Sequence, residues 1–368
     1  MLRKLYLLPA LLLISFAAIS QTTLTIPPNG GNKKASVSER IGITDVTIHY
    51  DRPAVKGREG KIWNDLVHAG YKDLGFGTSK QAPWRAGANE NTTITFSTDV
   101  MVEGKPVKAG TYGLFLAYDD SNPTLILSNN TQSWGSFFYD PKEDALRVNL
   151  KPMKLNESVE RLKYEFFNQT DNSATVALMW EKMSFPFKVD VDLVKIQLAV
   201  YRDELRGDKG FIWQNFVQAA DYAMQNNDME DAMKWSDIAM NSGFPGVKNF
   251  NTLSTRANIL NKSGKATEAD ALMKQAIPMA TMQELHQYGR QLLREKKTAQ
   301  ALQVFKMNND KYPNEFTTNM GLARGYSASG DFKSALKYAK IAETLSPASN
   351  KEMVGKLIKT LEGGKDIN

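Results

Sequence analysis

The sequence predicts an α+β multidomain protein in which an antiparallel β-sandwich domain is followed by an array of α-helical repeats. Three observations lead to this prediction. Short runs of alternating apolar and polar residues, separated by turn residues, occur up to residue 192, as in antiparallel strands. Beyond residue 193, apolar residues recur at helical spacing instead. Small residues in this second part also recur about every 34 residues, which indicates a structural repeat.

The chain starts with the features of a secretory signal. Two basic residues precede an apolar run that ends at Ile19, and the small residue Ser20 stands directly before Gln21. The run is shorter than the roughly 20 apolar residues of a membrane-spanning helix, and Pro9 interrupts it. We therefore expect residues 1–20 to be a signal peptide that is cleaved near Ser20–Gln21. The mature chain would then have no transmembrane span and would be exported to the periplasm or cell envelope.

The amino-acid composition limits the kinds of metal, disulfide and nucleic-acid-binding site that the chain can form. The 368-residue chain has no cysteine and three histidines, which excludes thiolate metal sites and disulfides. We expect no metal and no cofactor. The net charge of +6 falls to +4 once the two basic residues of the signal are removed, which is mild for a nucleic-acid-binding protein. We expect no nucleic-acid partner, and an exported protein without cysteine is typical of a bacterial envelope.

The first half of the chain is expected to be β-structure. Residues 21–34 are rich in turn-forming and polar residues and predict a flexible leader. The β-sandwich is expected over 35–192, with Lys105–Pro106 and Ala109–Gly110 marking a hairpin. Its strands are predicted at 46–50, 93–96, 111–118, 124–127, 147–150, 163–167, 175–180 and 185–191.

The second half is expected to be helical. Residues 193–210 predict a linker helix, and 211–362 predict about four helical repeats with a capping helix. In the last two units, matched residues such as Ala301 and Ala335 lie 34 positions apart. Two upstream units have spacings of 37 and 32 between alanines, so they are degenerate. Small residues at these positions let paired helices approach closely.

This pattern resembles the tetratricopeptide repeat. The last two units carry its spacing of small, aromatic and proline residues in Gly289, Leu292, Ala301, Phe305 and Pro313, and in Leu322, Ala323, Tyr326, Gly330, Ala335, Ala342 and Pro347. Arrays of this kind usually present a concave surface to a protein segment, so the resemblance implies a protein partner bound through the helical repeats. The alternative is that the array only packs against the β-domain.

Two polar stretches, 49–58 and 84–92, lie at the ends of predicted strands. Loops on a rigid scaffold are where binding sites concentrate. The candidate ligand-binding residues are Arg52, Lys56, Arg58, Trp84, Arg85, Asn89 and Glu90.

Three interpretations of these residues stay open. In the first, the arginines and Lys56 bind a small polar or anionic ligand, because guanidinium groups suit carboxylates and phosphates, and Trp84 stacks on it. In the second, the β-domain is hydrolytic or carbohydrate-active, with Glu90 as an acid or base positioned by Arg85 and Asp51 as the one candidate second carboxylate. In the third, the charged residues form a structural ion-pair network and Trp84 belongs to the core. No catalytic residue is assigned, and the incomplete catalytic set favours a protein that is not an enzyme.

Residues 35–192 resemble the bacterial family catalogued as domain of unknown function 2911. The resemblance implies an exported protein of the Bacteroidetes type without an established activity. The chain departs from the pattern in a longer segment at 67–83 and in Ala86, where Thr is common. The matching motifs are Ile41-Gly42, Tyr50-x-Arg52-Pro53-x-Val55-Lys56-Gly57-Arg58, Trp84-Arg85-x-Gly87-Ala88-Asn89-Glu90-x-Thr92, Gly104-Lys105, Ala109-Gly110-Thr111-Tyr112, Leu146-Arg147-Val148 and Trp180-Glu181.

Overall fold

A computed structural model describes residues 31–241 and 243–368 of the chain. The chain divides into two compact units between Asp192 and Leu193. The expected signal peptide, its cleavage position and the leader up to residue 30 lie outside the described residues. Within the described ranges, no helix is long and apolar enough to cross a membrane.

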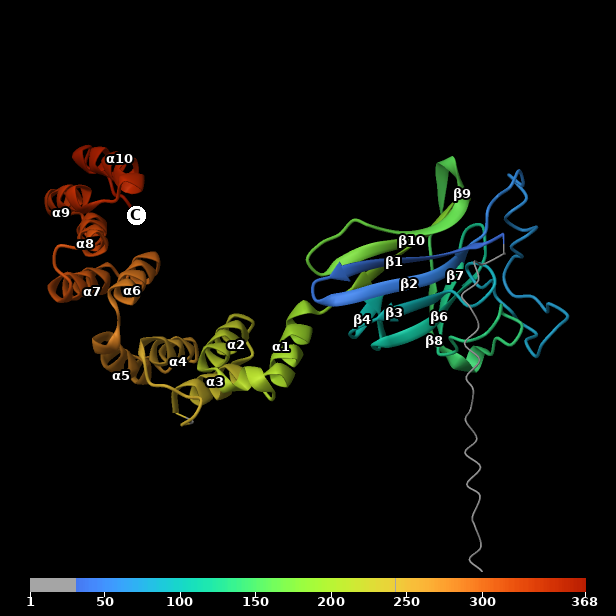
Figure 1. Cartoon of the computed structure of the whole chain (residues 1–368), viewed down its shortest axis with the longest axis horizontal. Coiled ribbons are helices and arrows are strands. Elements are labelled where there is room, and N and C mark those ends of the chain that lie inside the picture. The colour runs from blue at the N-terminus through green and yellow to red at the C-terminus, as the bar shows by residue number, and fades with distance from the viewer. Residues whose placement is uncertain (1–30, 242) are drawn as a thin grey trace, which may run out of the picture. The chain divides into compact units, whose positions relative to one another are not determined.

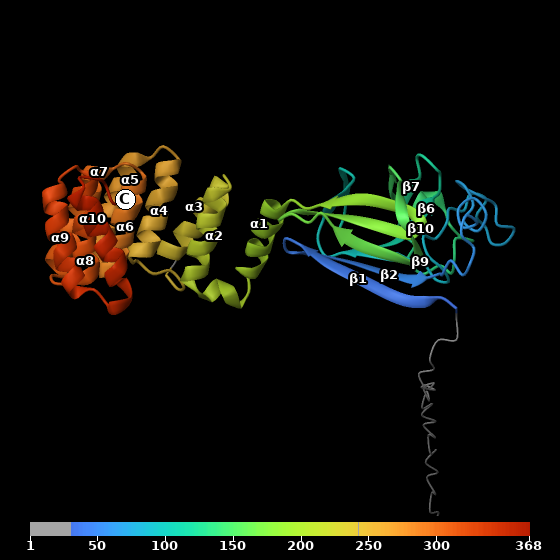
Figure 2. The same ribbon diagram turned by 90° about the horizontal axis from the view of Figure 1, so that it is seen from above.

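The first unit consists of two antiparallel sheets, which Figures 1 and 2 show as two layers. This confirms the predicted antiparallel β architecture. The larger sheet has the order β1 (Lys33–Ile41), β2 (Thr44–Arg52), β3 (Thr93–Phe96), β6 (Gly110–Ala117), β7 (Thr124–Ser128) and β8 (Asp144–Asn149). The smaller sheet has the order β5 (Lys105–Val107), β4 (Val100–Val102), β10 (Ser173–Asp190) and β9 (Met153–Phe167).

An aromatic cluster lies in the interior of this unit. The ring of Trp63 stacks on Tyr118 at a centroid distance of 4.9 Å, and Trp84 stacks on Trp180 at 6.0 Å. Trp180 and Phe185, both in β10, are buried, and Phe185 also contacts Trp63. This packing binds the loops that carry Trp63 and Trp84 to the long strand β10.

One edge strand was not predicted, and another begins before its predicted position. β1 starts at Lys33, within the leader predicted at 21–34, in a segment where no strand was predicted. β9 starts at Met153 rather than near residue 163. β1 pairs with β2 only, and β9 pairs with β10 and adds one isolated bridge to Ala54 on its other edge. Much of the outer edge of each strand therefore stays in water, and its sequence is polar and charged. Strong hydrophobic alternation is therefore missing from these segments.

The hairpin and the last strand also differ from the prediction. Lys105–Pro106 lies within the edge strand β5, and the turn is made by Glu103 and Gly104, which both have positive φ. The two runs predicted at 175–180 and 185–191 form the single strand β10, whose pairing with β9 shifts register between Met179 and Met183.

The second unit is helical, as predicted. α1 (Leu193–Glu204) precedes four helix pairs and a last helix. The pairs are α2 (Trp213–Gln225) with α3 (Met229–Asn241), α4 (Phe250–Lys262) with α5 (Ala266–Ala276), α6 (Met282–Arg294) with α7 (Thr298–Lys311), and α8 (Phe316–Ala328) with α9 (Phe332–Leu345), followed by α10 (Lys351–Glu362). We call α2, α4, α6 and α8 the first helices. They begin 37, 32 and 34 residues apart, so the irregular spacing in the sequence is the spacing of the helix pairs.

The small residues of the repeat lie between the paired helices. Ala232, Ala269, Ala301 and Ala335, one from each second helix, are all fully buried. Two first helices begin with capping boxes, at Asn249 and Thr281, whose side chains accept the main-chain N–H of the third helical residue. Buried small residues and capped ends fix the pairing that the tetratricopeptide-like pattern predicts.

Candidate functional site

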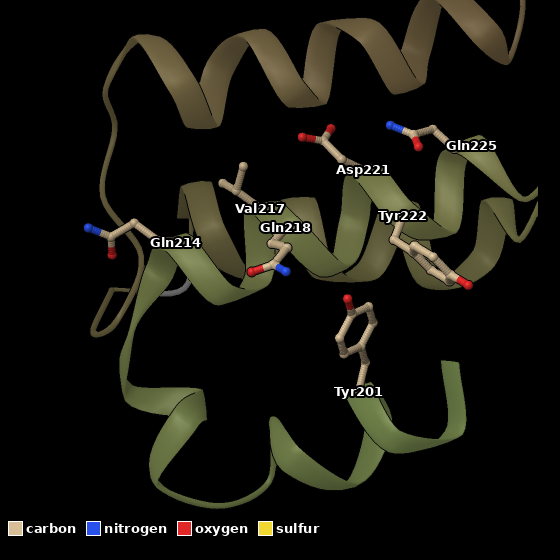
Figure 3. Close-up of a pocket in the computed structure, with 7 residues that line it drawn as sticks. All are labelled: Tyr201, Gln214, Val217, Gln218, Asp221, Tyr222 and Gln225. Atoms are coloured by element: carbon tan, nitrogen blue, oxygen red, sulfur yellow. The ribbon is translucent and has the colours of Figure 1, made fainter. Parts of the chain in front are cut away.

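A groove runs across the first helices of the helical unit. Side chains of α2, α4 and α6 line a cavity of about 410 Å³. A neighbouring cavity of about 440 Å³ lies between α1 and α2, where Figure 3 shows Tyr201 of α1 pointing toward α2. Both cavities are lined by Val217 and Asp221, so they adjoin each other at α2. We call the residues that line the two cavities the groove.

Carboxamide side chains dominate the lining of the groove. A carboxamide both donates and accepts hydrogen bonds, as a peptide main chain does. These residues come from equivalent helix positions, since Gln214, Asn251 and Gln283 are each the second residue of a first helix. The carboxamides of the groove are Gln214, Gln218, Gln225, Asn251, Asn258, Gln283, Gln287 and Gln291.

Hydrogen bonds tie neighbouring first helices together along this face. Asn251 Nδ2 donates to Glu284 Oε1 at 2.8 Å, and Gln283 Nε2 donates to Thr317 Oγ1 at 3.5 Å. These contacts join α4 to α6 and α6 to α8.

Charged groups of both signs lie along this face. Burial raises the pKa of Asp221 in α2, although a hydrogen bond with Thr255 works against the shift. Burial, with Arg290 and Arg324 nearby, lowers the pKa of His286 in α6 to about 4, so His286 is neutral at pH 7. The groove itself is lined by Asp221 of α2 and by both Glu284 and Arg294 of α6.

The side chains of two candidates in the β-domain, Arg52 and Arg58, bind main-chain carbonyl groups. Arg52 Nε donates to the carbonyl of Leu162 at 2.9 Å, which ties β2 to β9. Arg58 donates to the carbonyls of Val55 and Ala54, within its own loop. The Lys56 side chain is exposed, and its main-chain N–H donates to Glu160. Trp84 is half-buried in the aromatic cluster described above.

Arg85, Asn89 and Glu90 form a second group, together with residues outside the candidate set. The Arg85 guanidinium lies 5.5 Å from the ring centroid of Trp134, and its Nη1 donates to the Asn89 carbonyl at 3.2 Å. Gly135 packs against Arg85 so closely that a Cβ there would stand 2.6 Å from Nη1. Lys34 of β1 pairs with Glu90 at 3.0 Å.

A pair of carboxyl groups lies in this second group. Burial, and then a hydrogen bond with Glu90, raise the pKa of Asp51, while hydrogen bonds from the Glu90 main chain and from Lys34 lower the pKa of Glu90. The two carboxyl groups lie close enough for each to shift the pKa of the other.

The sequence analysis did not select Lys34 or Trp134. Trp134 is 59% exposed and opens a short run of aromatic residues that includes Phe137, Phe138 and Tyr139. Such a run in a loop is the signal that would have identified it. Among the described residues, no group of three or more His, Asp or Glu side chains is placed to hold a metal ion.

A family model matches the β-domain. Residues 32–189 match the model of a family described as "Protein of unknown function (DUF2911)", which confirms the resemblance inferred from the motifs. No curated protein matches the chain.

Solved structures similar to the chain include tetratricopeptide-repeat (TPR) proteins. YrrB, described as "a TPR protein with an unusual peptide-binding site", is 17% identical over 45% of this chain and 84% of its own, with a TM-score of 0.29. The C-terminal part of a TPR repeat-containing protein from Cytophaga hutchinsonii is 13% identical over 46% and 67%, with a TM-score of 0.33. MamA AMB-1 is 15% identical over 46% and 82%, with a TM-score of 0.28.

Proposed function

We propose that this chain, which joins a domain of that family of unknown function to tetratricopeptide-like repeats, is a scaffold that binds an extended segment of a protein partner in the groove. The observation that carries the proposal is the row of carboxamides at equivalent positions of successive first helices. Each carboxamide both donates and accepts hydrogen bonds, so it suits the main-chain amides of an extended peptide. Such contacts hold the main chain whatever its side chains are.

The charged groups that line the groove have both signs. Asp221 of α2 is acidic, and α6 contributes both Glu284 and Arg294. Charged groups of either sign on a partner segment therefore have an opposite charge available in the groove.

Site-specific photocrosslinking tests the proposal on the full chain. A photoreactive residue at Gln287, which lines the groove, should crosslink to discrete peptides in an extract of the producing cells. The matched control is Gln303, an equally exposed glutamine on α7 outside the groove. Equal crosslinking at both positions would contradict the proposal, and so would crosslinking at neither.

The proposal places the protein outside the cytoplasm, because the first twenty residues have the pattern of a signal peptide. Mass spectrometry of the protein isolated from cell fractions measures the start of the mature chain. A start at Gln21 in the periplasmic or envelope fraction is expected, and an intact Met1 in the cytoplasm would contradict export.

A second function is favoured by one observation in the β-domain. Trp134 remains 59% exposed beside the Arg85 guanidinium, and Glu90 and Asn89 lie within the same group. An exposed indole next to a guanidinium and a carboxylate suits a small polar or anionic ligand with a flat apolar face. A thermal-shift screen with sugars, nucleotides and dicarboxylates tests this. A stabilisation that Arg85→Ala and Trp134→Ala both abolish is expected, and a screen without any stabilisation would contradict it.

A further inference from the structure

The segment after α10 turns back and contacts α8. Figure 1 marks this end of the chain beside α8 and α10. Ile367 is buried, with 8% of its surface exposed, in a cluster that includes Met320 and Ala323 of α8 and Leu361 of α10. The segment therefore occupies a surface of a first helix.

The occupied surface continues the face that forms the groove. Arg324 is the ninth residue of α8, and Asp221 and Asn258 are the ninth residues of α2 and α4. Asp221 and Asn258 both line the groove. The hydrogen bond from Gln283 to Thr317 joins α6 to α8 along the same face. Residues 364–368 therefore lie where a peptide that extends beyond α6 would meet α8.

The contacts are those of a receptor for a peptide. Arg324 Nη1 donates to the carbonyl of Ile367 at 2.8 Å, and the Ile367 N–H donates to Ser327 Oγ at 3.1 Å. Ser327 Oγ donates in turn to Asp366 Oδ1 at 2.6 Å. Two of these bonds bind the main chain and one binds a carboxylate, while the Ile367 side chain fills an apolar pocket. The surface thus recognises an acidic residue followed by an aliphatic one.

The charge of the surface selects the same partner. Burial and the neighbouring Arg290 lower the pKa of Arg324, and the negative charge of Asp366 opposes this shift. An acidic side chain at this place relieves the repulsion between the two arginines. Although partial burial works in the opposite direction, hydrogen bonds from Ser327 and Asn368 leave the pKa of Asp366 below its usual range.

We propose that the α8 part of the face binds an extended peptide in which an acidic residue is followed by an aliphatic one. In this chain Asp366 and Ile367 occupy that surface in cis. A partner that extends past α6 must displace them. This inference rests on the proposed function, because it describes the far end of the same groove. A tethered segment has an effective concentration on the order of millimolar. An untethered peptide is therefore a weak competitor for the intact chain and binds well once the segment is released.

The test uses a fluorescent peptide with the sequence of residues 362–368, Glu-Gly-Gly-Lys-Asp-Ile-Asn. Its binding to the full chain and to the full-length variant D366A/I367A is measured by fluorescence anisotropy. The variant should bind the peptide about tenfold more tightly than the intact chain, because its own segment no longer competes. Adding Ser327→Ala to the variant should remove that binding.

Two outcomes would overturn the inference. One is equal binding to the intact chain and to the variant, and the other is no binding by a variant whose circular dichroism shows intact helices. Should the variant unfold, hydrogen exchange at the Ile367 amide of the intact chain decides instead. Excess peptide should accelerate that exchange, and an unchanged rate would overturn the inference. Crosslinking at Gln287 reports on the groove independently, so it distinguishes failure of this inference from failure of the proposed function.

Discussion

The ring of Phe305 in α7 occupies the space that a side chain at Gly289 in α6 would need. A Cβ at Gly289 would stand 2.4 Å from Cε1 of that ring. Glycine at this position lets the helices of the third pair approach closely enough for Phe305 to be fully buried. The contact explains in atomic terms why the repeat pattern requires a small residue there.

Gly289→Ala should therefore destabilise the helical unit. Overpacking of a filled core costs about 1–3 kcal/mol, and the free energy of unfolding is measured by urea titration followed at 222 nm. Gly355→Ala is the matched control, because the nearest atom to its Cβ would be Glu343 Oε1 at 3.9 Å. That substitution in α10 should stabilise the helical unit by about 0.5–1 kcal/mol, because alanine has a higher helix propensity than glycine. A neutral Gly289→Ala would show that the helices are not in close contact.

His286 makes the stability of the helical unit depend on pH. Burial, with Arg290 and Arg324 nearby, lowers its pKa from 6.5 to about 4, so the folded chain resists protonation. The unfolded chain takes up a proton near pH 6.5, so stability is lost as the pH falls from about 6.5 to about 4. Over this whole pH range the free energy of unfolding falls by about 3 kcal/mol.

The measurement is the free energy of unfolding of the helical unit at pH 7 and at pH 4.5. The difference should be smaller in His286→Gln than in the unchanged chain, because the variant cannot take up that proton. Arg290 and Arg324 are retained in the variant, so the other charges that face His286 stay the same. An identical difference in both proteins would rule out His286 as its source.

Replacement by alanine should destabilise the β-domain at one of two tryptophans and leave its stability almost unchanged at the other. Trp180 is buried in β10, and Trp180→Ala should cost about 3–5 kcal/mol of stability. Trp134 is 59% exposed, and Trp134→Ala should change stability by less than about 0.5 kcal/mol. Thermal denaturation of both variants measures the contrast. A large loss in Trp134→Ala would assign this residue to the framework and remove the reason to connect it with a ligand.

The repeat was predictable because its constraint is visible in the sequence. Close contacts between paired helices exclude large side chains at fixed intervals. Small residues such as Ala301 and Ala335 therefore indicate in the sequence where the second helices lie. The edge strand β1 and the first part of β9 were not predicted, for the opposite reason. Their residues face water on one side, so the sequence shows little periodicity there.

The candidate site in the β-domain was predicted only in part. Arg85, Asn89 and Glu90 lie together because they are neighbours in one loop. Arg52 instead donates to a carbonyl 110 residues away in the sequence, and no local pattern indicates that partner. Lys34 and Trp134 join the group through tertiary folding from distant segments, which is why a single polar stretch did not identify them.

Peptide affinity tests the central claim most directly. Peptides selected on the full chain from a random library are titrated against three single variants with unchanged circular dichroism. Asn258→Ala and Gln287→Ala each remove a carboxamide of the groove, and Gln303→Ala removes one on α7. A lost hydrogen bond of about 1 kcal/mol should raise the Kd about fivefold in each groove variant and leave it unchanged in Gln303→Ala. The same Kd in all three variants would contradict binding in the groove.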